Sequence, residues 1–516
     1  MRDNSKKHIK AMLALFCAMF VILCVYLVYT VHAYGTRWFT SPYNVRVQAQ
    51  KSSVQAGRIA DRNGALLAYT RADGERTYAA NKARRRALSH VVGDSYGQTI
   101  GAESMFARYL LGFDQSVADQ FVETIGGQQR VGSSVMLTVD AKLCDYAYDL
   151  MDDYWGAVVL LNYKTGEVLA SVSQPTFDPN YMADYISGSR ALAASAMVNR
   201  VTMGKYAPGS TFKTVTLIAA LRYLPGVTER EFDCDGALVF DKSSGKYLPD
   251  ISVDDSDFTS EGTATAYDRG REGAQDEPAQ PETAQDIYSI VRDYHSEYHG
   301  AISLMQAYAK SCNTTFARLA LEIGPKRMQQ TAKSLGIGDA FLFDDLLLYS
   351  SSYIKPASQF DLAWSGVGQY KDLMTPLQMC MLTAAVANDG VMMQPRMLYQ
   401  VVTRDNFVRM KQSAKAYKTI LSAAEAQVLQ QAMLGVVKSG TGTKAQVKGY
   451  AVGGKTGTAE ISANKQVNSH AWFTGFVQDD EHPLAICVIL EQAGSGSSKA
   501  APLAGKLLKR AIELGY

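Results

Sequence analysis

Residues 206–213 have the sequence Tyr-Ala-Pro-Gly-Ser-Thr-Phe-Lys, which places a hydroxyl and an amine three positions apart. Residues 214–224 are predominantly apolar and contain neither Gly nor Pro, which predicts a buried helix. The Pro208-Gly209 pair predicts a turn, so Ser210 would lie at or near the start of that helix. Because positions i and i+3 share a helix face, we expect the Ser210 hydroxyl within hydrogen-bond reach of the Lys213 amine. This arrangement suits a serine nucleophile whose proton is taken by a neutral lysine.

The bare Ser-x-x-Lys pattern is not specific. The same spacing occurs at Ser243/Lys246, Ser352/Lys355 and Ser462/Lys465, and none of these copies opens a long apolar helix. A helix-capping serine followed by a surface lysine is the alternative interpretation. The pattern alone therefore does not decide between a structural and a catalytic role.

Composition sets the broad class of the protein. With 516 residues, 47% hydrophobic and 20% charged, the chain is expected to fold into two or three globular domains. Its 52 basic and 50 acidic residues nearly balance, so charge gives no argument for nucleic-acid binding. The seven cysteines and seven histidines show no paired or metal-ligand spacing. We therefore expect no disulfide framework, no zinc site, and chemistry without metal or cofactor.

The N-terminus has the pattern of a membrane anchor. Four basic residues lie within positions 1–10, and an uncharged run follows over 11–31. Twenty-one helical residues span about 30 Å, the hydrocarbon thickness of a bilayer. We expect a cytoplasmic tail at 1–10, a transmembrane anchor at 11–31 and an extracytoplasmic remainder, because basic flanks stay inside. A cleaved signal peptide is the alternative, but its apolar run would be shorter and followed by a small-residue cleavage site.

Two further domains are expected after the anchor. Residues 32–132 predict a smaller non-catalytic domain that is extended and β-rich, beginning with an extended segment from Thr36 and containing a hairpin at Asn63-Gly64. Residues 133–516 alternate predicted helices with antiparallel hairpins, which indicates an α+β domain, an antiparallel sheet flanked by helices. Within it, 252–286 carries ten acidic residues against two arginines, which predicts a solvated, mobile insertion.

Two more motifs follow the first in a fixed order. They are Ser311-x-Asn313 and Lys455-Thr456-Gly457. Taken singly, the second is also explained by a local side-chain cap and the third by a turn with a surface lysine. Together the three describe one site, and this set is typical of penicillin-binding proteins and class A β-lactamases.

The chain resembles class B penicillin-binding proteins, which are membrane-anchored peptidoglycan D,D-transpeptidases, and most closely their PbpA-like branch in Gram-positive bacteria. The resemblance covers residues 57–516 apart from the acidic insertion. Besides the three motifs it rests on Gly57-Arg58-Ile59-x-Asp61-Arg62-Asn63-Gly64, the run 166–180, Thr375-Pro376-Leu377-Gln378 and His470-Ala471-Trp472-Phe473. It implies a transpeptidase domain of the serine β-lactamase-like fold, preceded by the anchor and a non-catalytic pedestal or dimerisation domain.

The resemblance also implies roles for three catalytic residues. Ser210 would attack the carbonyl of the penultimate D-Ala of a pentapeptide stem, forming an acyl-enzyme and releasing the terminal D-Ala. Lys213 would accept the serine proton, and Ser311 would relay a proton towards the leaving amine. β-Lactam antibiotics, which mimic D-Ala-D-Ala, would acylate Ser210.

Five further positions would bind the substrate. The resemblance assigns Asn313 to the substrate amide and to the positioning of Lys213. Lys455, Thr456 and Thr458 would bind the terminal carboxylate, and the backbone N–H groups of Ser210 and Thr458 would form the oxyanion hole. Gly457 would keep its strand bare, so that a peptide pairs alongside it.

There are three alternatives to the transpeptidase. A D,D-carboxypeptidase would use the same residues with water as the acceptor, and a β-lactam sensor or β-lactamase would need a signalling region or rapid deacylation. The third is non-enzymatic, a scaffold that activates a partner SEDS-type glycosyltransferase. Such a glycosyltransferase is also the partner that the resemblance implies for the anchor and the non-catalytic domain. The chain departs from the family pattern in its acidic insertion and in Cys312, the middle residue of the second motif.

Overall fold

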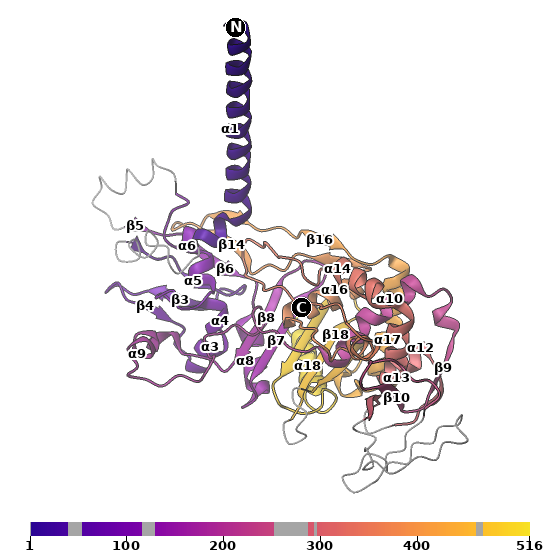
Figure 1. The fold of residues 1–516 in the computed structure, drawn as a ribbon. Helices are drawn as coiled ribbons and strands as arrows, with labels where there is room; N and C mark the ends of the chain where they lie inside the picture. The colour runs from indigo at the N-terminus through magenta and orange to yellow at the C-terminus, as the bar shows by residue number, and fades with distance from the viewer. Residues whose placement is uncertain (1, 40–53, 116–129, 252–286, 294–296, 461–467) are drawn as a thin grey trace, which may run out of the picture.

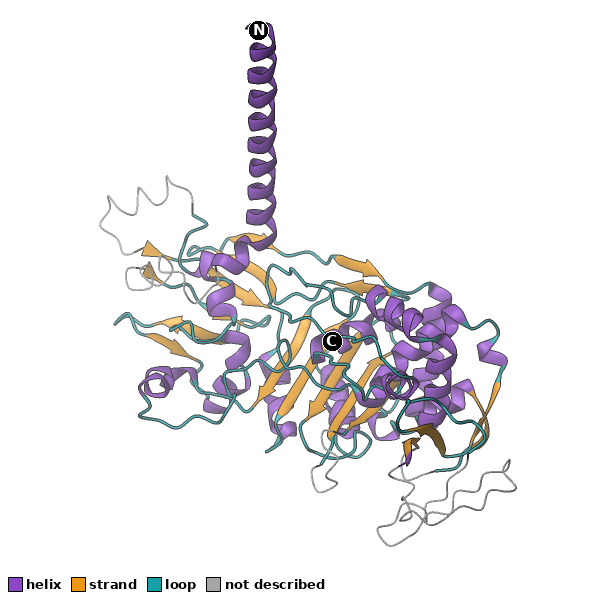
Figure 2. Ribbon diagram, in the orientation of Figure 1, coloured by secondary structure: helices purple, strands orange, loops and turns teal. Residues whose placement is uncertain are grey.

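A computed structural model describes residues 2–39, 54–115, 130–251, 287–293, 297–460 and 468–516 (Figures 1 and 2). The predicted insertion at 252–286 lies outside the described residues. Helix α1 (Arg2–Phe39) projects from the rest of the chain in Figure 1. Within its stretch Lys6–Val31, a window of 18 residues has a mean hydropathy of 2.8 and no buried residue, so the helix is long and apolar enough to cross a membrane.

The predicted extended segment from Thr36 is wrong at its beginning. Residues 36–39 complete the last turn of α1. Residues 32–39 contain no Pro and a single Gly, Gly35, so few residues there interrupt the helix. The remainder of that segment, residues 40–50, lies outside the described residues.

The region after the anchor is rich in short strands. Strands β2 (Ile59–Ala60) and β3 (Leu66–Thr70) form the predicted hairpin, and Gly64 adopts a φ of +83° in its turn. The other elements of this region are β1 (Val54–Gln55), β4 (Arg76–Tyr78), α3 (Lys82–Ala87), α4 (Ser89–Val92), α5 (Ala102–Met105), α6 (Ala107–Leu110) and β5 (Arg130–Val131).

One mixed sheet joins this region to the rest of the chain. Strand β6 (Ser134–Leu137) pairs in parallel with β2 and antiparallel with β14 (Leu398–Val402). The full strand order is β15-β14-β6-β2-β3-β4, with β15 at Val408–Lys411. The sheet therefore contains strands from both sides of residue 132, and the domain boundary expected there stays a prediction.

A second sheet, entirely antiparallel, forms the centre of the molecule. Its strand order is β17 (Val452–Ala459), β18 (His470–Val477), β19 (Leu484–Leu490), β7 (Gly156–Asn162) and β8 (Val168–Gln174). Every residue of β19 and β8 is buried, and because successive side chains point to opposite faces, both faces of the sheet are covered. This arrangement confirms the α+β prediction.

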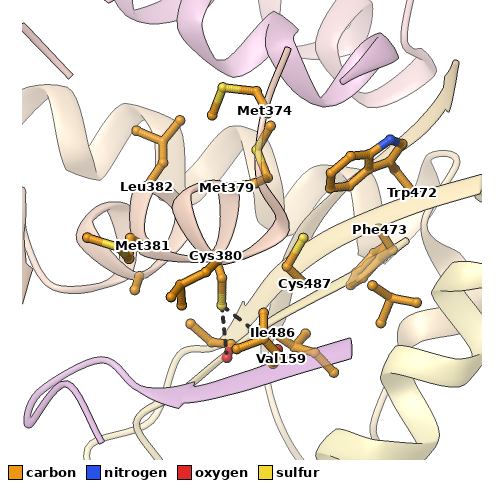
Figure 3. Packing of buried hydrophobic residues seen from close by; sticks show 14 of the residues in the cluster. Val159, Met374, Met379, Cys380, Met381, Leu382, Trp472, Phe473, Ile486 and Cys487 are labelled. Atoms are coloured by element: carbon orange, nitrogen blue, oxygen red, sulfur yellow. Dashed lines mark hydrogen bonds between the residues drawn. The ribbon is translucent and has the colours of Figure 1, made fainter. Parts of the chain in front are cut away.

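Helices pack directly on this sheet. Helix α16 (Pro376–Ala387) contacts β7, β18 and β19, α18 (Ala500–Glu513) contacts β18 and β19, and α8 (Ala141–Met151) contacts β8. In Figure 3, Cys380 of α16 points at the sheet beside Val159 and Ile486, and its Sγ lies 3.5 Å from the carbonyl oxygen of Ala485. Close packing of this kind holds the strands in a fixed position.

A group of helices lies beside the β17 edge, on the right in Figure 1. It contains α10 (Lys213–Tyr223), α12 (Leu304–Lys310), α13 (Asn313–Ile323), α14 (Pro325–Ser334), α15 (Gln359–Gly366) and α17 (Ala423–Ser439). The remaining elements are α9 (Met182–Ser187), β9 (Glu231–Cys234), β10 (Ala237–Asp241), β11 (Tyr288–Arg292), β12 (Gly300–Ser303), β13 (Val391–Met393), β16 (Ala416–Thr419) and the 3₁₀ turns η1 (Pro179–Tyr181), η2 (Gly209–Phe212), η3 (Val227–Glu229) and η6 (Thr443–Ala445).

Candidate active site

The first motif lies in a tight turn pressed against β17. Ser210 belongs to the 3₁₀ turn η2, and α10 begins directly afterwards at Lys213. Gly209 has a φ of +52°, and a Cβ at this position would lie 2.7 Å from the carbonyl oxygen of Thr458. Only glycine allows both the backbone conformation and this close approach. The turn therefore brings Ser210 next to Thr458 of the third motif.

Lys213 is buried and points at the second motif. Its Nζ donates to Asn313 Oδ1 at 2.6 Å, to Ser311 Oγ at 3.2 Å and to the carbonyl oxygen of Ser311. Within the described part of the chain these are its hydrogen bonds, so the expected bond to Ser210 Oγ is not formed. Burial lowers the pKa of Lys213 to about 8, against the opposing effect of the Asp293 charge.

The second motif is the junction between two helices. Ser311 ends α12 in the left-handed conformation, with a φ of 63°, and Asn313 is the first residue of α13. Asn313 Nδ2 donates to the carbonyl oxygen of Arg292 at 2.6 Å, which leaves its Oδ1 facing Lys213. A non-glycine residue rarely adopts this conformation, and strained positions of this kind cluster at functional sites.

Lys455 joins the third motif to the second. Its side chain is fully buried, and Nζ donates to Ser311 Oγ at 2.8 Å and to the carbonyl oxygen of Thr456 at 3.1 Å. Burial, and after it the charge of Lys213, lowers the pKa of Lys455 well below its ordinary value. Two amines therefore meet at one hydroxyl group.

The rest of the third motif follows along β17, the terminal strand of its sheet among the described residues. Thr456 Oγ1 lies 2.5 Å from Thr441 Oγ1, and Thr458 Oγ1 accepts from the backbone N–H of Gly496 at 3.4 Å. A Cβ on Gly457 would lie 2.9 Å from the carbonyl oxygen of Pro208. Gly457 thus admits the serine turn to the strand, a role that the sequence did not predict.

The structure brings all eight predicted positions into one site. They are Ser210, Lys213, Ser311, Asn313, Lys455, Thr456, Gly457 and Thr458. The three motifs come from η2 and α10, from the α12–α13 junction and from β17. Their convergence brings together the serine turn, the two buried amines of Lys213 and Lys455, and the terminal strand β17. These are the groups that acyl transfer through a serine ester requires.

Three residues of the site were not predicted. Asp293 Oδ1 accepts from the backbone N–H of Asn313, and Gln369 Nε2 donates to the carbonyl oxygen of Thr458 at 3.1 Å. The third residue is Thr441, whose hydroxyl is hydrogen-bonded to that of Thr456. Asp293 follows an acidic segment, so its sequence context did not distinguish it, and Thr441 stands between two glycines in a turn.

One group of residues near the second motif could hold a metal ion. The ligand atoms of Cys234, Asp293, His299 and Cys312 all lie within 4.8 Å of one another. Sequence spacing gave no sign of this group, because its members come from separate strand ends and a helix start.

Comparison with known proteins identifies relatives of this chain. The family model for the penicillin binding protein transpeptidase domain matches residues 156–242 and 262–509, more than half of the chain. The peptidoglycan D,D-transpeptidase PbpA of Mycolicibacterium smegmatis is 27% identical over 498 residues, which cover 92% of each chain.

Solved structures have the same fold. The D,D-transpeptidase domain of a peptidoglycan glycosyltransferase from Eggerthella lenta superposes with a TM-score of 0.69 at 27% identity, covering 90% of this chain and 99% of that one. The imipenem acyl-enzyme complex of penicillin-binding protein A from M. tuberculosis gives a TM-score of 0.71 at 24% identity, covering 90% of this chain and all of the other. At that identity the second likeness concerns the fold.

Proposed function

This chain belongs to the penicillin-binding protein transpeptidase family, and we propose that it is a membrane-anchored peptidoglycan D,D-transpeptidase whose nucleophile is Ser210. The observation that carries the proposal is the hydrogen-bonded network in which Lys213 and Lys455 both donate to Ser311 Oγ, beside the serine turn. If Lys213 and Lys455 were surface lysines, their amines would be exposed, but both side chains are fully buried.

The reaction has two steps. Ser210 Oγ attacks the carbonyl carbon of the penultimate D-Ala, and its proton passes to the neutral amine of Lys213. The C–N bond breaks, the terminal D-Ala leaves with a proton relayed through Ser311, and an ester on Ser210 remains. The amine of a neighbouring stem then attacks this ester, and Ser210 recovers its proton as the cross-link forms.

The surrounding residues bind the stem peptide. Lys455, Thr456 and Thr458 hold its terminal carboxylate, and Asn313 holds an amide. The backbone N–H groups of Ser210 and Thr458 stabilise the oxyanion, where loss of one donor typically costs about 10²–10³ in rate. As the terminal strand, β17 offers backbone groups with which an extended peptide pairs.

Labelling with a fluorescent penicillin tests the nucleophile. We expect the full-length protein in detergent to be labelled and Ser210→Ala to be unlabelled. Ser243→Ala is the matched control, because Ser243 also belongs to a Ser-x-x-Lys pattern but is exposed, and it should label like the wild type. An unlabelled wild type would refute the proposal, and labelled Ser210→Ala would place the nucleophile elsewhere.

Product analysis separates the transpeptidase from a carboxypeptidase. With a pentapeptide stem and an acceptor amine, the transpeptidase yields a cross-linked product, whereas a carboxypeptidase yields only the shortened stem and D-Ala. Mass spectrometry distinguishes these products. Shortened stem alone, at saturating acceptor, would contradict the transpeptidase proposal.

The proposal includes membrane topology and a partner. The basic residues before the apolar stretch of α1 keep the N-terminus in the cytoplasm, and the transpeptidase domain lies outside. The partner is a SEDS-type glycosyltransferase, bound through α1 and the N-terminal region. A periplasmic-type reporter fused after Tyr516 should be active, and the glycosyltransferase should co-purify with Ser210→Ala as well as with the wild type. Loss of co-purification on exchanging α1 for an unrelated anchor would support binding through that helix.

A further inference from the structure

A group of four potential ligands lies directly behind the second motif. Cys234 ends β9, Asp293 follows β11, His299 precedes β12 and Cys312 caps α13. The β9–β12 pairing places Gly300 opposite Cys234, which brings His299 beside the thiol. The fold therefore assembles the group from four chain segments, with no contribution from the substrate-binding strand.

Four of the distances between the ligand atoms are close to those of a tetrahedral site. Asp293 Oδ2 lies 3.0 Å from Cys234 Sγ, 3.4 Å from Cys312 Sγ and 3.8 Å from His299 Nδ1. Cys234 Sγ and His299 Nδ1 are 3.3 Å apart. In a tetrahedral zinc site, bond lengths of about 2.0–2.3 Å place the ligand atoms roughly 3.3–3.8 Å from one another.

Burial and the donor set select the kind of ion. Cys234 and Cys312 are fully buried, and the side chains of Asp293 and His299 are 1% and 6% exposed. Two sulfurs, an imidazole nitrogen and one carboxylate oxygen suit zinc, whereas magnesium and calcium take oxygen ligands. With four protein ligands the coordination is complete, which is typical of a structural and not a catalytic site.

Neighbouring polar groups would orient these ligands. The second ring nitrogen of the histidine, His299 Nε2, lies 3.3 Å from Glu297 Oε2, the carboxylate–histidine arrangement that accompanies metal-binding imidazoles. Thr314 Oγ1 donates to Asp293 Oδ2 at 2.9 Å and lies 3.2 Å from Cys234 Sγ. These contacts fix which atoms face the centre of the group.

The group is joined to the candidate active site by covalent and hydrogen bonds. Cys312 stands between Ser311 and Asn313, and Asp293 Oδ1 accepts from the Asn313 backbone N–H. We propose that Cys234, Asp293, His299 and Cys312 bind a structural zinc ion that fixes the second motif under Lys213. Binding displaces the protons of the two thiols to solvent, so that both sulfurs coordinate as thiolates.

Metal analysis of the full-length protein, purified in detergent without a metal-affinity step, tests the proposal. We expect about one zinc ion per chain, lost in Cys234→Ala. Cys487→Ala is the matched control, because Cys487 is equally buried but lies in β19 away from the group, and it should keep its zinc. The proposal would be overturned if wild type from zinc-replete medium contained no zinc, or if Cys234→Ala contained as much zinc as the wild type.

Two measurements remain informative if Cys234→Ala does not fold. Glu297→Gln changes a side chain that is 65% exposed, and it should weaken zinc binding by about tenfold in a chelator competition. Stripping the wild type with a chelator should lower its Tm and slow acylation about tenfold, and zinc chloride, but not magnesium chloride, should restore both. Unchanged Tm and acylation after complete stripping would contradict the proposed role, and a Cys234–Cys312 disulfide in the isolated protein would exclude the site.

Discussion

The amine of Lys455 lies 2.8 Å from the hydroxyl oxygen of Ser311, and the amine of Lys213 lies 3.2 Å from the same atom. A hydroxyl oxygen has two lone pairs, so Ser311 can accept from both lysines at once. Both side chains are fully buried, and two ammonium charges at this distance repel each other. The arrangement therefore favours a neutral amine in the site, which a lysine acting as a base requires.

The rate of acylation should depend on the protonation of Lys213. Burial lowers its pKa to about 8, and only the neutral amine can accept the Ser210 proton. Below pH 8 the neutral fraction, and with it the acylation rate constant, should rise about tenfold per pH unit, and it should level off above pH 8. Stopped-flow labelling with a fluorescent penicillin between pH 6 and 9 measures this. A rate independent of pH over this range would contradict the role of Lys213.

Removing Lys455 should slow acylation strongly. Lys455→Ala removes a donor to Ser311 and the amine expected at the substrate carboxylate, and we expect a loss of about 10²–10³ in the second-order rate constant. The comparison is Lys438→Ala, which removes an exposed lysine at the end of α17. The rate constant of Lys438→Ala should equal that of the wild type. Equal rate constants for both variants would refute a role for Lys455.

The central sheet and the apolar N-terminal helix could be predicted from the sequence, because each has a periodic or compositional signal. The resemblance to class B penicillin-binding proteins is confirmed by the family match. The apolar runs at 156–162 and 484–490 are buried strands, and the uncharged run at 11–31 lies within α1. Among the four Ser-x-x-Lys copies, Ser210 was distinguished by the apolar helix that follows it and by the order of the two later motifs.

Contacts within the site were harder to predict, because they depend on tertiary packing. The expected Ser210–Lys213 hydrogen bond assumed a regular helix from Ser210, but this residue lies in a 3₁₀ turn. The three donors of Lys213 are instead directed to Ser311 and Asn313, a hundred positions along the chain. Asp293 likewise acts through a backbone N–H, for which a sequence has no signature.

Substituting Gly457 should disturb both stability and acylation. A Cβ there would meet the Pro208 carbonyl oxygen at 2.9 Å and Thr211 Cγ2 at 3.0 Å, so the serine turn would have to move away from β17. We expect Gly457→Ala to cost about 1–3 kcal/mol in the free energy of unfolding. A displacement of the nucleophile of about 1 Å can cost roughly 10²-fold in rate, which fluorescent penicillin labelling detects.

Gly435→Ala is the control for Gly457→Ala. Gly435 lies in α17 and has no atom within 4 Å of the added Cβ. Alanine in a helix interior is more stable than glycine by roughly 0.5–1 kcal/mol, so this variant should gain stability and keep its acylation rate. If Gly457→Ala were as stable and as reactive as Gly435→Ala, the close contact between η2 and β17 would not position Ser210.

A largely buried ion pair fixes the segment that leads to the nucleophile. Arg200 Nε lies 2.7 Å from Glu491 Oε1, and the Tyr206 hydroxyl donates to the same oxygen at 2.7 Å. The two charged side chains are 6% and 19% exposed, so Glu491→Ala would leave Arg200 buried without its partner. We expect a loss of roughly 3 kcal/mol in the free energy of unfolding, measured as a shift of the urea midpoint.

The exposed pair Arg71–Glu75 is the comparison for this prediction. Its side chains are 51% and 68% accessible, and Glu75→Ala should cost less than about 1 kcal/mol. Equal midpoints for the two variants would show that the Arg200–Glu491 pair does not hold this segment in place.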